Sequence, residues 1–324
     1  MINSFTLQFN RMNEMLAGAK NILIASHQNP DPDAVASALT LNYVFKNRNF
    51  QTLPYLPDKP AETLSFLPGF SDIKTEIGSF EPDLIFCLDY GDFKRLKLPE
   101  HVLSKQGLRI ITIDHHLESD QRGDIKILDP KISSTSEIIY YWIKHENIDI
   151  NKDIASLLLS GMFSDSGGFC HVSTSAKTLN IVSELISKGA SLDKIARNTL
   201  DFNKPLNLSR TWGKILSRTK IDKRTGLAYS WLKMDELKKF NVNLFDFDGI
   251  TNIISATSLV NLGLLLIEYE KGKVKGSLRS EPQGGINVAE LVKSLNGGGH
   301  AYAAGFSQEG TIEDVLKKVL NLIQ

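Results

Sequence analysis

The residues most able to do chemistry in this 324-residue chain lie in four short polar clusters, each directly behind an apolar run. Together these clusters offer six side chains that commonly bind metal ions: His27, Asp31, Asp33, Asp89, His115 and Asp165. Carboxylates and imidazoles without a thiolate suit Mn²⁺, with Mg²⁺, Fe²⁺ or Co²⁺ as substitutes. Six ligands are too many for one ion that keeps open positions. They suit two ions that share a carboxylate, as phosphoester hydrolases use.

Each cluster also has a purely structural interpretation, and at this point both interpretations stay open. Asp31 is equally suited to cap the helix that follows its loop. Asp89 follows an apolar run and can cap the next turn, while the glycines behind Asp165 can simply end a helix. A single histidine behind a buried strand is more often a core residue. The adjacent pair His115 and His116 is therefore the hardest cluster to explain by packing.

Composition narrows the class of protein. The chain has 37 basic and 37 acidic residues and is 42 % hydrophobic, so it is neither a disordered chain nor a globally basic nucleic-acid binder. Cys87 and Cys170 are too few for a disulfide framework or a cysteine metal cage, and a reduced, cytoplasmic setting is the default expectation. The most apolar stretch, residues 262–267, is far shorter than the ~18 residues that a membrane span needs, so no membrane partner is expected.

The elements that must position the clusters alternate between strands and helices. Short apolar runs predict strands at residues 21–25, 84–88, 108–113 and 125–128. Helical spacing of apolar residues predicts helices around residues 5–16, 34–45, 136–145, 154–163 and 177–187. This alternation indicates an α/β domain with a parallel sheet covered on both faces. Ligands bind at the carboxyl ends of such strands, which is where the clusters lie.

The local charge and the pattern of predicted elements change near residue 191. Residues 193–224 hold nine Lys or Arg against three Asp, a local charge of +6, and then a second set of elements begins. Strands are predicted at 227–232, 262–269 and 273–280, and helices at 286–294 and 312–323; Thr311 and Asp314 resemble a capping box for the last helix. We therefore expect a first domain at 1–190, a helical basic connector at 191–224, and a smaller mixed-sheet domain at 225–324.

Two motifs identify a family resemblance. Asp114-His115-His116 and the later GGGH motif, Gly297-Gly298-Gly299-His300, occur in the order seen in DHH phosphoesterases with a DHHA1 domain. The chain resembles the nanoRNase A group of this superfamily, which are bifunctional oligoribonucleases and 3′-phosphoadenosine-5′-phosphate (pAp) phosphatases. The exonuclease RecJ is a larger relative.

The resemblance implies a role for each clustered residue. One Mn²⁺ would be held by His27, Asp31 and Asp89. A second would be held by Asp33, Asp89, His115 and Asp165, so that Asp89 bridges the two ions. Asp114 would orient the histidines, His116 would face the scissile phosphate, and a water acidified by both ions would be the nucleophile.

The second domain is expected to bind the substrate. Three successive glycines let a backbone approach an anion closely, and if a helix begins at His300, its free N–H groups point toward that anion; a flexible loop is the structural alternative. In the strand at 273–280, Ser277 and Arg279 share a face with Lys273 and Lys275. Arg279 can grip a phosphate through two hydrogen bonds, whereas the two lysines are better explained as a solvated face. A row of cations in the connector, Arg210, Lys214 and Arg218, and the nearby Trp212 also fit solvated and core positions better than a substrate site.

These expectations combine into a two-domain enzyme with its active site in the cleft between the domains. The predicted substrates are oligoribonucleotides of a few residues, linear dinucleotides and pAp, and not long duplex nucleic acid, because the basic residues are local. Three alternatives remain. They are a cyclic-dinucleotide or polyphosphate hydrolase with the same metal site, a non-catalytic nucleotide-binding regulator, and a dinucleotide oxidoreductase, which lacks support because no G-x-G-x-x-G follows the first strand. The sequence leaves a homodimer open.

Overall fold

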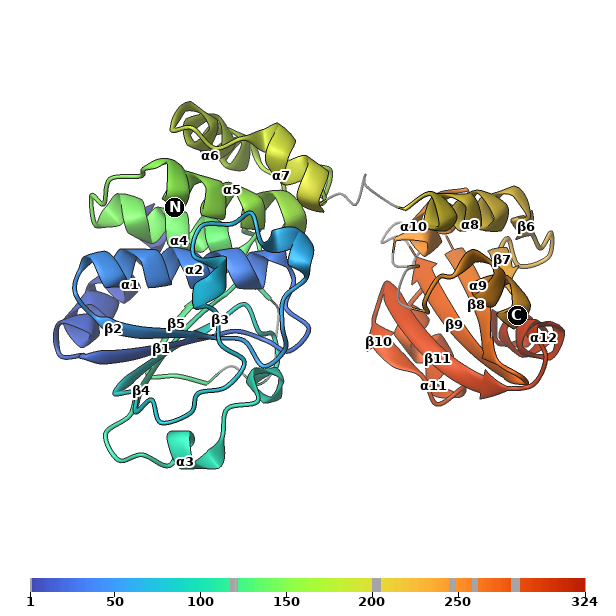
Figure 1. The fold of residues 1–324 in the computed structure, drawn as a ribbon, viewed down its shortest axis with the longest axis horizontal. Helices are drawn as coiled ribbons and strands as arrows, with labels where there is room; N and C mark the ends of the chain where they lie inside the picture. Colours follow the sequence, from blue (N-terminus) through green and yellow to red (C-terminus); the bar gives the residue numbers. More distant parts are fainter. Residues whose placement is uncertain are drawn as a thin grey trace. The chain divides into compact units, whose positions relative to one another are not determined.

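A computed structural model describes residues 2–116, 120, 122–199, 205–244, 247, 249–257, 262–280 and 286–323, with the backbone alone at residues 2–4 and 300. The chain divides into two compact units, Met1–Asn203 and Lys204–Gln324. Each is described by itself (Figure 1). The predicted connector, residues 191–224, spans the division between them.

The first unit is built on a five-stranded parallel sheet. In chain order the strands are β1 (Asn21–Ala25), β2 (Gln51–Tyr55), β3 (Leu84–Leu88), β4 (Arg109–Asp114) and β5 (Ile125–Leu128). Their order in the sheet is β2-β1-β3-β4-β5. The predicted parallel sheet is confirmed, and β2 is an additional strand. The sequence hid β2 because Pro54 argues against a strand, yet β2 lies at the edge of the sheet, where proline is tolerated.

Helices cover one face of this sheet, as Figure 1 shows. They are α1 (Ile2–Ala17), α2 (Pro32–Asn47), α4 (Thr135–His145) and α5 (Lys152–Asp165). Their apolar stripes share one core with alternate strand residues such as Ile24, Phe86 and Ile113. The other strand residues, such as Ile85, pack against the 3₁₀ helix η3 (Phe93–Leu96) and α3 (Glu100–Leu103). Both sheet faces are thus covered, and α6 (Ala176–Ser187) and α7 (Leu192–Thr199) complete the unit.

The first helix has the predicted amphipathic pattern. Phe5, Phe9, Met12 and Leu16 of α1 are buried in the core. Asn13 ties the helix to α4, because its Oδ1 accepts a hydrogen bond from Trp142 Nε1 (3.2 Å) and its Nδ2 donates to Glu146 Oε1 (2.6 Å). A segment at the start of the chain therefore packs against one that lies about 130 residues later.

The second unit holds a six-stranded mixed sheet in the order β10-β11-β9-β8-β7-β6. Its strands are β6 (Lys220–Ile221), β7 (Ala228–Leu232), β8 (Leu262–Glu270), β9 (Lys273–Ser280), β10 (Gly298–His300) and β11 (Ala303–Glu309). Within this sheet, as far as the structure describes its residues, β7 and β8 pair in parallel and the other neighbouring strands pair antiparallel. The predicted mixed sheet is confirmed, and β6, β10 and β11 add to the three predicted strands.

Helices also cover this sheet. Among the described residues of the unit, the helices are α8 (Leu206–Ser217), α9 (Met234–Phe240), α10 (Ile250–Ala256), α11 (Val288–Lys293) and α12 (Ile312–Ile323). The core with α11 and α12 contains Leu264 and Leu278, and the core with α8, α9 and α10 contains Leu265. The predicted capping box begins α12: Thr311 Oγ1 accepts from the Asp314 amide (3.1 Å), and Asp314 Oδ2 accepts from the Thr311 amide (3.2 Å).

Candidate metal centre

The ends of the strands in the first unit bring the predicted ligands together. His27 and Asp31 follow β1, Asp89 follows β3, His115 and His116 follow β4, Asp33 begins α2 and Asp165 ends α5. They form three groups in which one ligand atom from each residue lies within 4.8 Å of the others: His27–Asp31–Asp89, Asp33–His115–Asp165 and Asp89–His115–His116. Asp89 and His115 each belong to two groups, so the three groups form one continuous centre.

The loop after β1 serves both of the roles considered for it. Asp31 is the N-cap of α2, where its side chain accepts a hydrogen bond from the Ala34 amide (2.9 Å), and Pro32 occupies the first helical turn. The same Asp31 carboxylate lies 3.5 Å from His27 Nε2. Helix capping therefore fixes the position of a side chain that also belongs to a ligand group.

Asp89 is held by its backbone as well as its side chain. Its φ of +50° turns the chain out of β3, and its amide donates to Ile113 of the neighbouring strand (3.1 Å). Among the described residues, Asp89 Oδ2 and His115 Nε2 are buried without a hydrogen-bond partner, although His115 Nε2 is 2.9 Å from Asp165 Oδ2. Buried polar atoms without partners are costly, and a cation would satisfy both atoms. The carboxylate oxygens and imidazole nitrogens of this centre thus fit divalent metal ions as ligands.

The first turn of α4 donates hydrogen bonds to the buried Asp33. The Thr135 amide lies 2.7 Å from Asp33 Oδ2, and the Ser136 amide lies 3.1 Å from Oδ1, which the Ser136 hydroxyl also contacts. Gly161 of α5 makes this approach possible, because a Cβ there would overlap both Ser136 Oγ and Asp33 Oδ1. Sequence reasoning missed these supporting residues. Their only signal, a serine- and threonine-rich start of a helix, is that of an ordinary cap, and Ser134 is indeed the N-cap.

The electrostatics of the centre are those of carboxylates crowded into a buried space. Burial and the neighbouring Asp165 raise the pKa of Asp33 to about 7. Burial and the carboxylates of Asp33 and Asp31 raise the pKa of Asp89 well above its ordinary value. Burial opposes the charged form of His115, but Asp165 outweighs burial and raises its pKa to about 9. Positive charge is thus favoured here, and divalent cations would supply it.

Asp114 has a different environment, although it belongs to the same motif. Its Oδ2 accepts from the Tyr90 and Gly91 amides (3.0 and 2.9 Å), and its Oδ1 lies 2.8 Å from His116 Nδ1. Burial alone would raise the pKa of Asp114, but these hydrogen bonds and His116 hold it below its ordinary value. Asp114 therefore orients His116, whereas His115 Nδ1 lies 3.3 Å from the Ile132 carbonyl instead.

Arg95 is a further residue of this centre that sequence reasoning did not single out. Its Nη2 lies 2.9 Å from His27 Nδ1, and its Nη1 donates to the Tyr90 carbonyl (3.2 Å). Its own carbonyl accepts from the Gln28 amide (2.8 Å). Arg95 thus ties the loop after β1 to the loop after β3, and no local pattern around it signals this role.

The second unit presents the predicted substrate-binding residues on one sheet face. Lys273, Lys275, Ser277 and Arg279 are half-buried and alternate with buried neighbours along β9. The register places Ala303 beside Arg279 and Gly305 beside Ser277, so small residues lie next to the predicted phosphate-binding side chains. The strand alternation expected from the sequence is therefore present.

No helix begins at His300, so the GGGH motif does not offer an anion the free N–H groups of a helix start. Gly298–His300 forms β10, which pairs antiparallel with β11 through Gly298–Gly305, Gly299–Ala304 and His300–Ala303. Glycine is needed for this pairing, since Gly299 has φ +145° and a Cβ there would overlap the Ala303 carbonyl. Gly298, in contrast, has open space where a Cβ would lie. The motif is therefore a tight strand pair with an accessible glycine and not a helix N-terminus.

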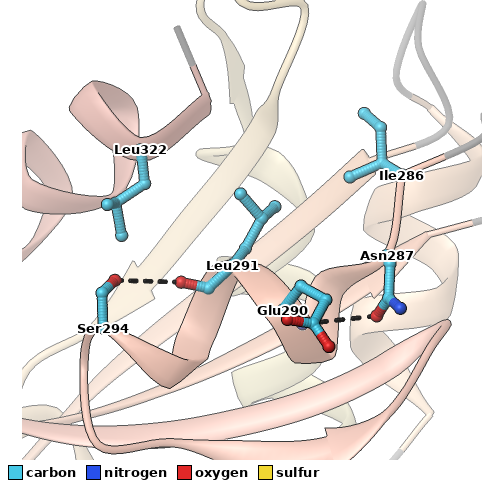
Figure 2. Close-up of a pocket in the computed structure, with 6 residues that line it drawn as sticks. All are labelled: Ile286, Asn287, Glu290, Leu291, Ser294 and Leu322. Atoms are coloured by element: carbon cyan, nitrogen blue, oxygen red, sulfur yellow. Dashed lines mark hydrogen bonds between the residues drawn. The ribbon is translucent and has the colours of Figure 1, made fainter.

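Other candidate features of the second unit are structural. Lys214 and Arg218 both pair with Glu236, Arg218 through two nitrogens at 2.9 and 2.8 Å, and Trp212 packs against the core. A pocket of about 440 Å³ is lined by Ile286, Asn287, Glu290, Leu291, Ser294 and Leu322. Figure 2 shows these side chains. The six lining residues include no Lys, Arg or His, so the pocket does not suit a phosphate.

Comparisons with known proteins agree with this geometry. Residues 21–162 match the N-terminal domain of the DHH family, and residues 228–324 match the DHHA1 domain. A probable bifunctional oligoribonuclease and PAP phosphatase, NrnA of Streptococcus mutans, is 28 % identical over 94 % of this chain and 95 % of its own length. NrnA of Bacillus subtilis is 26 % identical over 88 % of each chain.

A solved structure extends the likeness to the fold. The exopolyphosphatase-related protein of Bacteroides fragilis superposes with a TM-score of 0.88 at 30 % identity, covering 98 % of this chain and 96 % of that one. None of the helices within the described residues has the length and apolar character to cross a membrane.

Proposed function

We propose that this chain, which belongs to the DHH family of phosphoesterases and carries a DHHA1 domain, hydrolyses short oligonucleotides and pAp with the help of manganese ions. The NrnA relatives, whose names give both activities, support this substrate class. The observation that carries the proposal is the continuous centre in which Asp89 and His115 join the three ligand groups.

The ligands of this centre would be divided between two ions. His27, Asp31 and Asp89 would hold one, and Asp33, Asp89, His115 and Asp165 would hold the other, with Asp89 common to both. When bound, two divalent ions would lower the pKa of a water molecule and neutralise the charge of the phosphate. Mn²⁺ suits this set of carboxylates and imidazoles, and Mg²⁺, Fe²⁺ and Co²⁺ are the chemically similar substitutes.

His116 is the proposed catalytic side chain that belongs to neither of these two ligand sets. Its Nδ1 is engaged by Asp114 Oδ1 at 2.8 Å, and the side chain is 39 % exposed. An imidazole fixed through Nδ1 presents Nε2 to a substrate, where it can donate a hydrogen bond to a phosphoryl or leaving-group oxygen. Asp114 would keep His116 in this orientation.

The second unit would recognise the substrate. Arg279 offers a guanidinium for a phosphate, Ser277 a hydroxyl on the same face, and Gly298 an accessible backbone. Gly299 and His300 would shape this surface by pairing β10 with β11, and Gly297 by its close approach to Gly305 and Phe306 of β11. The formal charge of zero for the whole chain favours short substrates over long polymers, because long nucleic acids are bound mainly through many phosphate contacts.

A substrate panel tests the proposal. With Mn²⁺ present, pAp, dinucleotides and five-residue RNA should be cleaved much faster than a twenty-residue strand, and excess chelator should abolish turnover. Equal or faster cleavage of the long strand would contradict the preference for short substrates. Full activity in chelator would contradict the metal requirement.

Polyphosphate hydrolysis is a second candidate function. It is favoured by the name of the Bacteroides fragilis protein, which is exopolyphosphatase-related and 30 % identical to this chain. Adding polyphosphate, pyrophosphate and cyclic dinucleotides to the same panel separates the two candidates. A higher kcat/KM for polyphosphate than for pAp and dinucleotides would select the second one.

A further inference from the structure

Thr135 contacts carboxylates that belong to different ligand groups. It is the first residue of α4 and is fully buried. Its amide donates to Asp33 Oδ2 (2.7 Å), whereas its hydroxyl donates to Asp89 Oδ1 (3.0 Å). Asp33 groups with His115 and Asp165, whereas Asp89 belongs to the other two groups, with His27 and Asp31 and with His115 and His116. One residue thus links the two proposed ion sites through two of its own atoms.

The two carboxylates depend on Thr135 to different degrees. Asp33 also accepts from the Ser136 amide (3.1 Å), so it keeps a partner on Oδ1 if Thr135 is changed. For the Asp89 carboxylate, Thr135 donates the one hydrogen bond that the described part of the chain provides. This bond engages Oδ1, which also lies 3.5 Å from His115 Nε2 and from His116 Nδ1, whereas Oδ2 has no hydrogen-bond partner. The hydroxyl of Thr135 therefore helps to keep Oδ1 on the side of the centre where His115 lies.

We propose that Thr135 is a positioning residue that makes the second metal-binding step possible, by keeping the Asp89 carboxylate shared between the two ion sites. This inference rests on the proposed two-ion function. Without the hydroxyl, Oδ1 would lose its hydrogen-bond donor, and the Asp89 carboxylate would be held less firmly toward His115. The shared ligand of the second site is then less well positioned, so the loss falls on the second ion and not on the first.

The substitution Thr135→Val tests this division. Valine keeps the shape of threonine and the backbone amide that binds Asp33, and it removes the hydroxyl alone. Thr40→Val is the matched control, because Thr40 is equally buried but its hydroxyl donates to the Ala36 carbonyl (2.7 Å) within α2. Thr135→Ser should behave as wild type, since it restores the hydroxyl.

The metal-free full chain is titrated with Mn²⁺ alone. Calorimetry measures the binding of each ion, and electron paramagnetic resonance detects the coupled ion pair. Wild type and Thr40→Val should bind two ions per chain and show the signal of an exchange-coupled Mn²⁺ pair. Thr135→Val should bind the first ion as wild type does and the second about ten- to a hundred-fold more weakly, with the coupled signal displaced to higher Mn²⁺. If Thr135→Val does not fold, as judged by thermal unfolding without metal, Thr135→Ala provides the same comparison.

The outcomes separate this inference from the proposed function. Equal weakening of both ions, no weakening of either, or fewer than two ions on wild type would overturn the role of Thr135. If wild type holds a coupled ion pair that depends on Thr135 but hydrolyses no substrate of the panel, the coupling stands and the proposed phosphoesterase function fails.

Discussion

The two units differ in how deeply they bury the charged side chains of their candidate sites. In the first unit, the carboxylates of Asp33 and Asp89 are buried, at 0 % and 1 % exposure, and are held by hydrogen bonds from α4. In the second unit, the charged side chains along β9 are half-buried beside small residues of β11. Chemistry at a metal centre needs ligands that are fixed before the ion arrives, whereas recognition of a substrate needs groups that remain accessible.

The largest expected effect is that of Asp89→Asn. Because Asp89 is shared by the proposed ion sites, kcat/KM should fall by more than about a hundred-fold. Replacing a residue that only hydrogen-bonds to a metal ligand typically costs about ten- to a hundred-fold. The metal-free variant should nevertheless melt higher than wild type, since it no longer buries a crowded carboxylate. Metal content, activity and melting temperature should be measured together. Asp92→Asn is the control, because it removes a carboxylate charge at the N-cap of η3 and keeps an oxygen that can accept from the Lys94 amide. An active Asp89→Asn enzyme would show that the centre does not depend on a shared carboxylate.

Gly161→Ala tests how rigid the first unit is. The added methyl would overlap Asp33 Oδ1 and Ser136 Oγ, so the ligand must move. We expect kcat/KM to fall by roughly a hundred-fold. This is the upper end of the losses seen when residues that position a metal ligand are disturbed. The same substitution at Gly213 in α8 meets no atom within 4 Å and should stabilise its helix by about 0.5–1 kcal/mol. Similar losses of activity in both variants would contradict the contrast between the units.

Arg279→Ala tests whether recognition can be separated from chemistry. Bound Mn²⁺ should be unchanged, because all proposed ligands lie in the first unit. For pAp and dinucleotides, kcat/KM should fall roughly ten- to a hundred-fold, as for the loss of a charge-assisted contact. Lys273→Ala is the control on the same strand face, since Lys273 already pairs with Glu270 (2.8 Å). A small non-nucleotide ester should be hydrolysed almost equally by the variant and wild type. Loss of metal, or equal losses on all substrates, would assign Arg279 a structural role.

The smallest expected effect is on the stability of the metal-free protein as a function of pH. The pKa of Asp33 is raised to about 7 and that of His115 to about 9, so between pH 5 and 9 the folded state binds more protons than the unfolded state. Stability should therefore fall as pH rises through this window, by roughly 5 °C or more in melting temperature. Added Mn²⁺ should stabilise most at high pH, where its ligands carry no protons. Asp33→Asn should flatten the metal-free profile, and a profile that rises with pH would contradict the crowded-carboxylate description.

The sequence predicts the elements of the first unit more accurately than those of the second. In the first unit, strands β1, β3 and β5 have the predicted bounds, because continuous apolar runs such as residues 84–88 have few alternatives to a buried strand. The proposed ligands follow these strands, so their proximity follows from the parallel sheet. Thr135 and Arg95 could not be predicted, because Asp89 lies 46 residues from Thr135 and His27 lies 68 residues from Arg95, and the local patterns of both are ordinary.

In the second unit, tertiary pairing overrides the local signals. Three glycines carry no strand propensity, and β10 exists because β11 lies beside it. For this reason the motif forms a strand and neither a helix start nor a flexible loop. The alternation of β9, in contrast, was predictable, since Val274 and Leu278 must be buried while Ser277 and Arg279 are not.

The packing of α1 on α4 has a consequence for the time course of synthesis. The apolar side chains of α1 are made first, but their partner Trp142 follows about 130 residues later. At about 5–20 residues per second, the ribosome needs roughly 6–26 seconds to reach it. During that interval Phe5, Phe9 and Met12 have no native neighbour from α4, and a nascent chain stalled before Trp142 should bind chaperones more strongly than one stalled beyond α5.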